Sequence, residues 1–180
     1  RSPARSDQEF GVKAYNTKRQ SNGTVYFQKP GKMAWVYTTP ADNRVVSNGS
    51  TVRVYEAANK QMFEQQVNGA QSGAQYPAAL SFLLGTGKLG NAFNFEAFEG
   101  SQMKFEGGHV LVGTPKTPTP AYTKVLFYVD TQTAQIRRVL ILDAQGNRNS
   151  FVFSQVQVNT TVPASTFVFE PPAGTTVVRP

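Results

Sequence analysis

The chain has no cysteine among its 180 residues and only one histidine, His109. The lack of cysteine excludes disulfides, thiolate metal sites and cysteine nucleophiles, and it fits a reducing or an oxidising compartment equally. We interpret His109, which follows two glycines, as a solvated turn residue, so histidine-based catalysis is not expected. The sequence also lacks a G-x-S-x-G elbow and a phosphate-binding glycine loop between a strand and a helix.

Acidic residues are few, with 11 Asp and Glu against 18 Lys and Arg, and they are dispersed. The densest group is Glu96, Glu99 and Glu106, whose spacing does not suit a metal, so we expect them to be solvated. The sequence leaves open a catalytic acid–base pair of carboxylates that are distant in sequence and come together only in the folded chain. We therefore expect no metal, no cofactor and no catalytic residues, and by elimination a binding protein with an apolar interior.

Long apolar runs are also missing, since no stretch approaches the roughly 20 residues that cross a bilayer. The chain opens with RSPARSDQEF and has no initial methionine. This opening is typical of a processed or trimmed product, whose targeting segment would already be gone.

The net charge of +7 favours partners such as nucleic acid, anionic lipid or acidic proteins, although scattered cations also serve solubility alone. A binder of single-stranded nucleic acid would interleave exposed aromatics with Lys and Arg on one sheet face. Residues 51–57 (TVRVYEA) and 136–142 (IRRVLIL) have some of this character. Most aromatics instead alternate with equally apolar residues, which favours core or cavity lining and argues against nucleic acid as a partner.

What the sequence does contain is a series of short alternating segments separated by Asn, Gly and Pro, the signature of an antiparallel meander. The QSNG stretch at 20–23 predicts a hairpin turn, and the three prolines of 114–122 exclude a central strand there. The tail 171–180 is expected to be extended. The predicted strands are 10–19, 24–28, 33–37, 44–47, 51–57, 61–67, 92–98, 109–113, 123–130, 136–144, 149–158 and 166–170.

The middle of the chain predicts one helix, which begins near Pro77 and ends at Gly85. Its apolar side chains fall at helical spacing and would share one face: Tyr76, Leu80, Leu83 and Leu84.

Strands of the second half are apolar on both faces. Val125, Phe127 and Val129 alternate with Leu126 and Tyr128, and residues 139–142 behave alike. Both faces must be covered, or one must face an apolar cavity, and a single predicted helix offers little cover.

Four short patterns, in order, carry a family resemblance. They are the basic, proline-marked turn before Met33-Ala34-Trp35, the strand–turn–strand VVSNGSTVRVYE, the strand end HVLVGTPK and the terminus TFVFEPPAGTTVV. Together with the proline-started helix they resemble the outer-membrane lipoprotein carrier family (LolA-type) over roughly residues 12–178. Each pattern alone is weak, and their order makes the match specific.

This resemblance implies a mainly β fold: a strongly curved antiparallel sheet, an incomplete barrel, with a short helical lid over an apolar concave cavity. It implies a periplasmic carrier in a Gram-negative bacterium. Such a carrier receives acylated lipoproteins from an inner-membrane ABC-type release complex and passes them to an outer-membrane lipoprotein acceptor. Membrane association would be transient.

The resemblance also places residues. Met33, Trp35 and Phe127 would line the acyl-chain cavity, and Leu80, Leu83 and Leu84 would belong to the lid, whereas Lys29 and Pro30 would lie at the rim where cargo is passed on. Ordinary alternatives remain for each: a turn at Pro30, core packing for Met33 and Trp35, and a helix docked on a closed core.

One departure concerns the start of the chain. The family begins with an amphipathic helix, whereas here about ten mostly polar residues precede the first predicted strand. We expect residues 1–180 to form a single domain whose N-terminal lid helix is missing or trimmed. The family's F-x-Q pattern in the first strand is also not evident.

Three rival interpretations stay open. An outer-membrane acceptor (LolB-type) or a lipid-binding sensor would share the fold, although the polar loop 38–43 argues against a membrane-inserting loop. A basic β-sheet protein that binds nucleic acid or anionic glycans would lose affinity steeply with salt. An enzyme is the most distant alternative.

Overall fold

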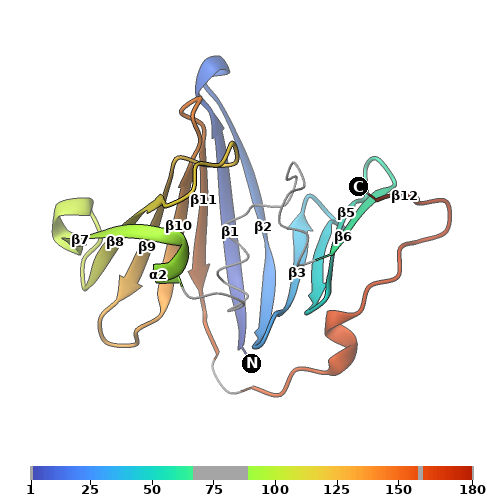
Figure 1. Ribbon diagram of the computed structural model, residues 1–180. Helices are drawn as coiled ribbons and strands as arrows, with labels where there is room; N and C mark the ends of the chain where they lie inside the picture. The colour runs from blue at the N-terminus through green and yellow to red at the C-terminus, as the bar shows by residue number, and fades with distance from the viewer. Residues whose placement is uncertain (1, 67–88, 158–159, 180) are drawn as a thin grey trace. The chain divides into compact units, whose positions relative to one another are not determined.

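The computed structural model describes residues 2–66, 89–157 and 160–179 (Figure 1). These residues are mainly β, as predicted, and their twelve strands form one open sheet in the order β12-β6-β5-β4-β3-β2-β1-β11-β10-β9-β8-β7. Strand β12 pairs with β6 in parallel, whereas the pairs from β2–β3 to β5–β6 and from β7–β8 to β10–β11 are antiparallel.

The chain divides into two compact units, and strands β1 and β2 each contribute residues to both. The first unit is residues 1–6, 21–86 and 155–180, and the second is residues 7–20 and 87–154. The described elements are β1 (Ser2–Val12), η1 (Lys13–Tyr15), β2 (Thr17–Gln28), β3 (Lys32–Thr39), β4 (Arg44–Asn48), β5 (Thr51–Glu56), β6 (Gln61–Gln66), α2 (Leu89–Ala92), β7 (Phe93–Glu99), η2 (Gly100–Met103), β8 (Gly108–Pro115), β9 (Lys124–Asp130), β10 (Ile136–Leu142), β11 (Arg148–Ser154), η3 (Ala164–Phe167) and β12 (Thr176–Val178).

The C-terminal segment covers one face of the sheet in the first unit. Phe167, on η3, is buried with Ala34 of β3 and Val46 of β4, and Val162 completes this cluster. Because Ala34 and Val46 are directly opposite each other in the β3–β4 pairing, they share the face that the segment covers.

In the second unit, strands β9 and β10 are buried on both faces. Val110, Leu126, Tyr128 and Leu140 form a cluster with Met103 of η2 and three other partly buried side chains packed against it. Their neighbours on the opposite face are also buried, namely Val125, Phe127, Val139 and Ile141. The prediction that these strands are apolar on both faces is confirmed.

Two local predictions are wrong. The first hairpin turns at Lys13–Tyr15 and Asn16, and the predicted turn at 20–23 instead lies inside β2. Residues 166–170, predicted as a strand, comprise the end of η3 and irregular chain. The helix predicted over 76–85, with Leu80, Leu83 and Leu84, lies outside the described residues.

Candidate functional site

Strand β3 carries the two predicted cavity residues of the first unit. Met33 and Trp35 are 0% exposed, and they share a face because they alternate along the strand. Trp35 is opposite Val25 of β2 and Val45 of β4, and its ring stacks on that of Tyr37 with centroids 5.8 Å apart. Burial raises the pKa of Tyr37 well above its ordinary value.

This row of side chains is distinct from the face under the C-terminal segment. Ala34 lies between Met33 and Trp35 and points to the opposite face, where Phe167 packs. Strand β3 therefore supports two apolar layers, one on each face. A strand with one wet face would instead alternate buried and exposed residues.

The predicted rim residues, Lys29 and Pro30, are exposed in the turn between β2 and β3. Gly31 follows with φ at +71°, a conformation that favours glycine. The buried hydroxyl of Ser47 donates a hydrogen bond of 2.8 Å to the carbonyl oxygen of Gly31. The turn is thus fixed to β4, and the strand that leaves it carries Met33 and Trp35.

Phe127 lies in the second unit, on β9, and is 1% exposed. Its ring meets those of Phe93 and Phe95 edge-on, at centroid distances of 6.3 and 6.1 Å. Gly113 of β8 makes room for these rings, since a Cβ there would lie 2.9 Å from Phe95 and 3.1 Å from Phe93. The structure therefore places Phe127 in an aromatic cluster of its own unit, whereas the other described site residues share one hairpin of the first unit: Lys29, Pro30, Met33 and Trp35.

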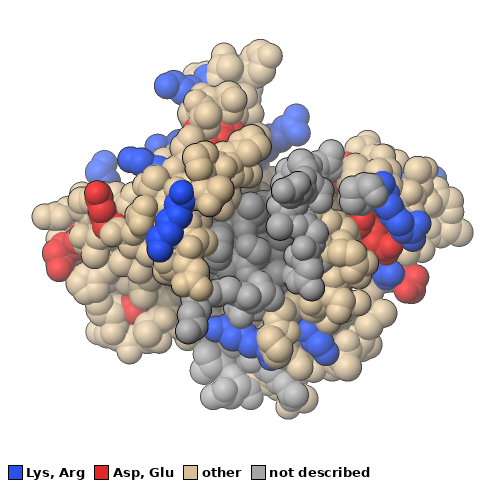
Figure 2. Space-filling view, viewed as in Figure 1, with Lys and Arg blue, Asp and Glu red and all other residues tan. Residues whose placement is uncertain are grey.

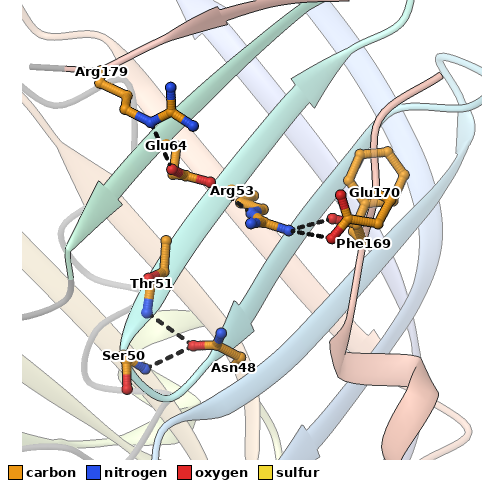
Figure 3. A network of polar contacts seen from close by, with 8 residues as sticks. All are labelled: Asn48, Ser50, Thr51, Arg53, Glu64, Phe169, Glu170 and Arg179. Carbon is orange, nitrogen blue, oxygen red and sulfur yellow. Dashed lines mark hydrogen bonds and ion pairs between the residues drawn. The ribbon is translucent and has the colours of Figure 1, made fainter. Parts of the chain in front are cut away.

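The sequence did not predict a charged network that fastens the C-terminal segment to β5 and β6 (Figure 3). Arg53 donates from Nε to Glu64 at 2.8 Å and from Nη1 to the carbonyl oxygen of Phe169 at 2.6 Å, and Nη1 also lies 3.3 Å from Glu170. Arg179 donates to the other oxygen of Glu64 at 2.8 Å. Hydrogen bonds from Arg179 and then Arg53 hold the pKa of Glu64 below its ordinary range.

This network gives Arg53 of the TVRVYEA stretch a structural role. Arg53 in TVRVYEA lies on a face where it is opposite Glu64, and its side chain is only 29% exposed. The sequence signal for this network is the opposite charge of Arg53 and Glu64. It can be recognised only when the register of β5 on β6 is known, because the register places the two residues opposite each other. Arg53 therefore joins β5 and β6 to the C-terminal segment.

His109 lies within β8, where its imidazole is half exposed and 3.5 Å from the Glu99 carboxylate. The two residues form part of the lining of a hollow of about 390 Å³, with Ala97, Phe98, Gln102 and Leu111. Over residues 2–66, 89–157 and 160–179, acidic and imidazole side chains form no group of three that could hold a metal. Within the same ranges, no helix is long and apolar enough to cross a bilayer.

Buried apolar residues on both strand faces define an open β-sheet protein with an extensive apolar interior. The chain matches the family described as outer membrane lipoprotein carrier protein LolA over residues 4–170, and it belongs to that family. The outer-membrane lipoprotein carrier protein of Bordetella bronchiseptica is 31% identical over 163 residues, which cover 91% of this chain and 72% of that protein.

A second relative supports the same assignment. The outer-membrane lipoprotein carrier protein of Albidiferax ferrireducens is 29% identical over 184 residues, which cover 98% of this chain and 79% of that protein. Among solved structures, an uncharacterized conserved protein from Thermus thermophilus is similar with a TM-score of 0.57 and 12% identity, covering 99% of this chain and 90% of that one. That likeness concerns the fold alone.

Proposed function

We propose that this protein is a non-catalytic carrier that binds the acyl chains of lipoproteins and moves them through the periplasm from the inner to the outer membrane. The observation that carries the proposal is the fully buried row of Met33 and Trp35, on the face of β3 opposite the C-terminal segment. This row belongs to the family-like stretch that begins at the exposed Lys29-Pro30 turn. Membership of the lipoprotein carrier family supports the same function.

Burial of acyl chains supplies enough free energy for this task without a cofactor. Each buried methylene contributes about 0.8 kcal/mol, so even one chain binds strongly to an apolar face. Release then requires a partner with a deeper or more apolar pocket, because a carrier cannot discard the chain into water. We infer an inner-membrane ABC-type complex as the donor and an outer-membrane lipoprotein acceptor as the receiver.

The single tryptophan provides a direct test, since Trp35 is the only one in the chain. We expect a lipopeptide with brominated acyl chains to quench the Trp35 emission, because bromine quenches an indole only at short range. The same lipopeptide without bromine should bind equally and leave the emission nearly unchanged. Fluorescence titration, with calorimetry as an independent measure of binding, checks this expectation.

Salt separates this function from the rival of a different class, a basic protein that binds nucleic acid or anionic glycans. Acyl-chain binding should hardly change between low and high salt, whereas binding to nucleic acid or anionic glycans weakens steeply. Failure to bind the lipopeptide would overturn the carrier function. Binding without quenching would remove only Trp35 from the site.

A second test concerns the rim. We expect Lys29→Leu to load lipopeptide normally but to transfer it at least several-fold more slowly to an outer-membrane acceptor, since a rim charge acts mainly on the encounter between partners. Lys29 is exposed, and the hydrogen bond from Ser47 to Gly31 holds its turn, so the fold should tolerate the change. A stopped-flow transfer assay measures the rate, and Lys29→Arg, which keeps the charge, is the matched control. Equal transfer rates for Lys29→Leu and the parent protein would exclude this role.

A further inference from the structure

The tip of the β1–β2 hairpin, in the second unit, exposes an aromatic side chain between cations. Tyr15 lies on η1, and its side chain is 79% exposed. Lys13, Lys18 and Arg19 are exposed on either side of it. Neither the buried row on β3 nor the charged network at the C-terminal segment involves this tip.

Hydrogen bonds hold the tip in place. The backbone N–H of Lys13 donates to Oδ1 of Asn147 at 3.1 Å, across from the turn between β10 and β11. Asn147 in turn donates its backbone N–H and its Nδ2–H to the two oxygens of Asp143, both at 2.8 Å. Asn16 closes the tip with φ at +49° and a backbone hydrogen bond to the carbonyl of Lys13. Tyr15 is therefore presented by a supported loop.

The neighbouring turns add charge at the same end of the unit. Arg148 begins β11 and is exposed directly after Asn147. Lys124 begins β9, is exposed, and is opposite Leu142 at the end of β10. Figure 2 shows Lys and Arg side chains around the tip, which is drawn at the top as in Figure 1.

The nearby carboxylates do not neutralise these cations. The Glu9 carboxylate lies 3.2 Å from the amino group of Lys18, which accounts for one charge. Asp143, whose oxygens accept hydrogen bonds from its own turn, adds a second negative charge, against five cations: Lys13, Lys18, Arg19, Lys124 and Arg148. The tip thus keeps an excess of positive charge around an exposed phenol.

We propose that this tip, residues 13–19 with Lys124 and Arg148, docks on a membrane surface that contains anionic phospholipid. Tyrosine side chains partition to the headgroup region, where the ring contacts acyl carbons and the hydroxyl meets water. Each Lys or Arg near an anionic bilayer strengthens binding by about five-fold. A single aromatic residue anchors only weakly, so docking is reversible.

The tip suits a bilayer better than a nucleic acid. Proteins that hold single strands stack successive bases on several aromatic side chains along a groove. The hairpin tip presents one, Tyr15, and the aromatic cluster of this unit at Phe93, Phe95 and Phe127 is mostly buried. This inference goes beyond the acyl-chain site and does not depend on it.

Vesicle flotation tests the proposal on the whole protein. We expect the protein to float with vesicles of phosphatidylcholine and phosphatidylglycerol at low salt and to dissociate from them at high salt. It should not bind vesicles of pure phosphatidylcholine. The variant Lys13→Gln with Arg19→Gln should bind about thirty-fold more weakly, from two lost charges. Tyr15→Ser should weaken binding several-fold while keeping the salt dependence.

A control with the same net charge makes the test specific. Lys60→Gln with Lys104→Gln removes two exposed cations from turns outside the tip and should bind like the parent protein. Equal weakening by both double variants would overturn the proposal, as would failure of the parent protein to bind anionic vesicles. Binding that is insensitive to salt and unchanged in the tip variants would also overturn it, because phospholipid would then be held by an apolar site.

Discussion

Replacing Phe167 by alanine is expected to lower the free energy of unfolding by about 3–5 kcal/mol, the usual loss for a large core side chain. Phe167 is 2% exposed and packs on Ala34, Val46 and Val162, so its removal leaves a cavity between the C-terminal segment and β3–β4. Chemical denaturation followed by circular dichroism measures the change.

The adjacent residue is a matched control. Val168 follows Phe167 directly but is 62% exposed, so Val168→Ala should change the free energy of unfolding by no more than about 0.5 kcal/mol. Similar losses for the two variants would contradict the packing described for η3. A large loss for Phe167→Ala alone would establish that the C-terminal segment is part of the core of its unit.

The strands were predictable because they combine alternating apolar residues with breaks at Asn, Gly and Pro. One break was misread at QSNG. Gly23 lies at an irregularity in the β2–β3 register, where a Cβ would come 2.2 Å from the carbonyl oxygen of Val36. The glycine thus serves a close approach of two strands, whereas Asn16, with its positive φ, makes the actual turn.

Residues 166–170 show a second limit of sequence patterns. Phe167 and Phe169 alternate with exposed Val168, which is also typical of a strand with one buried face. Here the segment packs against the face of the sheet without joining it as a strand, and Phe169 lies beside Tyr55 with ring centroids 5.3 Å apart. The alternation identified the buried side chains correctly, but it could not distinguish a strand from a segment that lies across a sheet.

At the candidate site, burial is predictable from local sequence, whereas contacts between distant residues are not. The family resemblance predicted that Met33 and Trp35 line an acyl-chain cavity, with core packing as the alternative, and the structure shows that both are buried. The contact between Glu64 and Arg179 joins positions 115 residues apart, and no local sequence pattern predicts it. Its discovery required the register of β5 and β6 and the course of the C-terminal segment.

Phe127 offers the sharpest separation between a closed core and an acyl-chain wall. We expect Phe127→Ala to lower the free energy of unfolding by about 3–5 kcal/mol, since the ring is buried against Phe93 and Phe95. If this face also binds acyl chains, as the family resemblance implies for Phe127, the vacated space accommodates roughly two further methylenes. At about 0.8 kcal/mol each, they would shift the preference for longer over shorter chains about tenfold.

Titration with lipopeptides that differ only in acyl length measures this preference for the parent protein and the variant. Val152→Ala is the control, because Val152 lies on β11 of the same unit but is 41% exposed. It should alter neither stability nor chain-length preference appreciably. A destabilised Phe127→Ala variant with the parent's chain-length preference would mean that Phe127 is a core residue and that acyl chains bind elsewhere. A shifted preference requires that the ring and the chain compete for one space, which an ordinary core residue cannot produce.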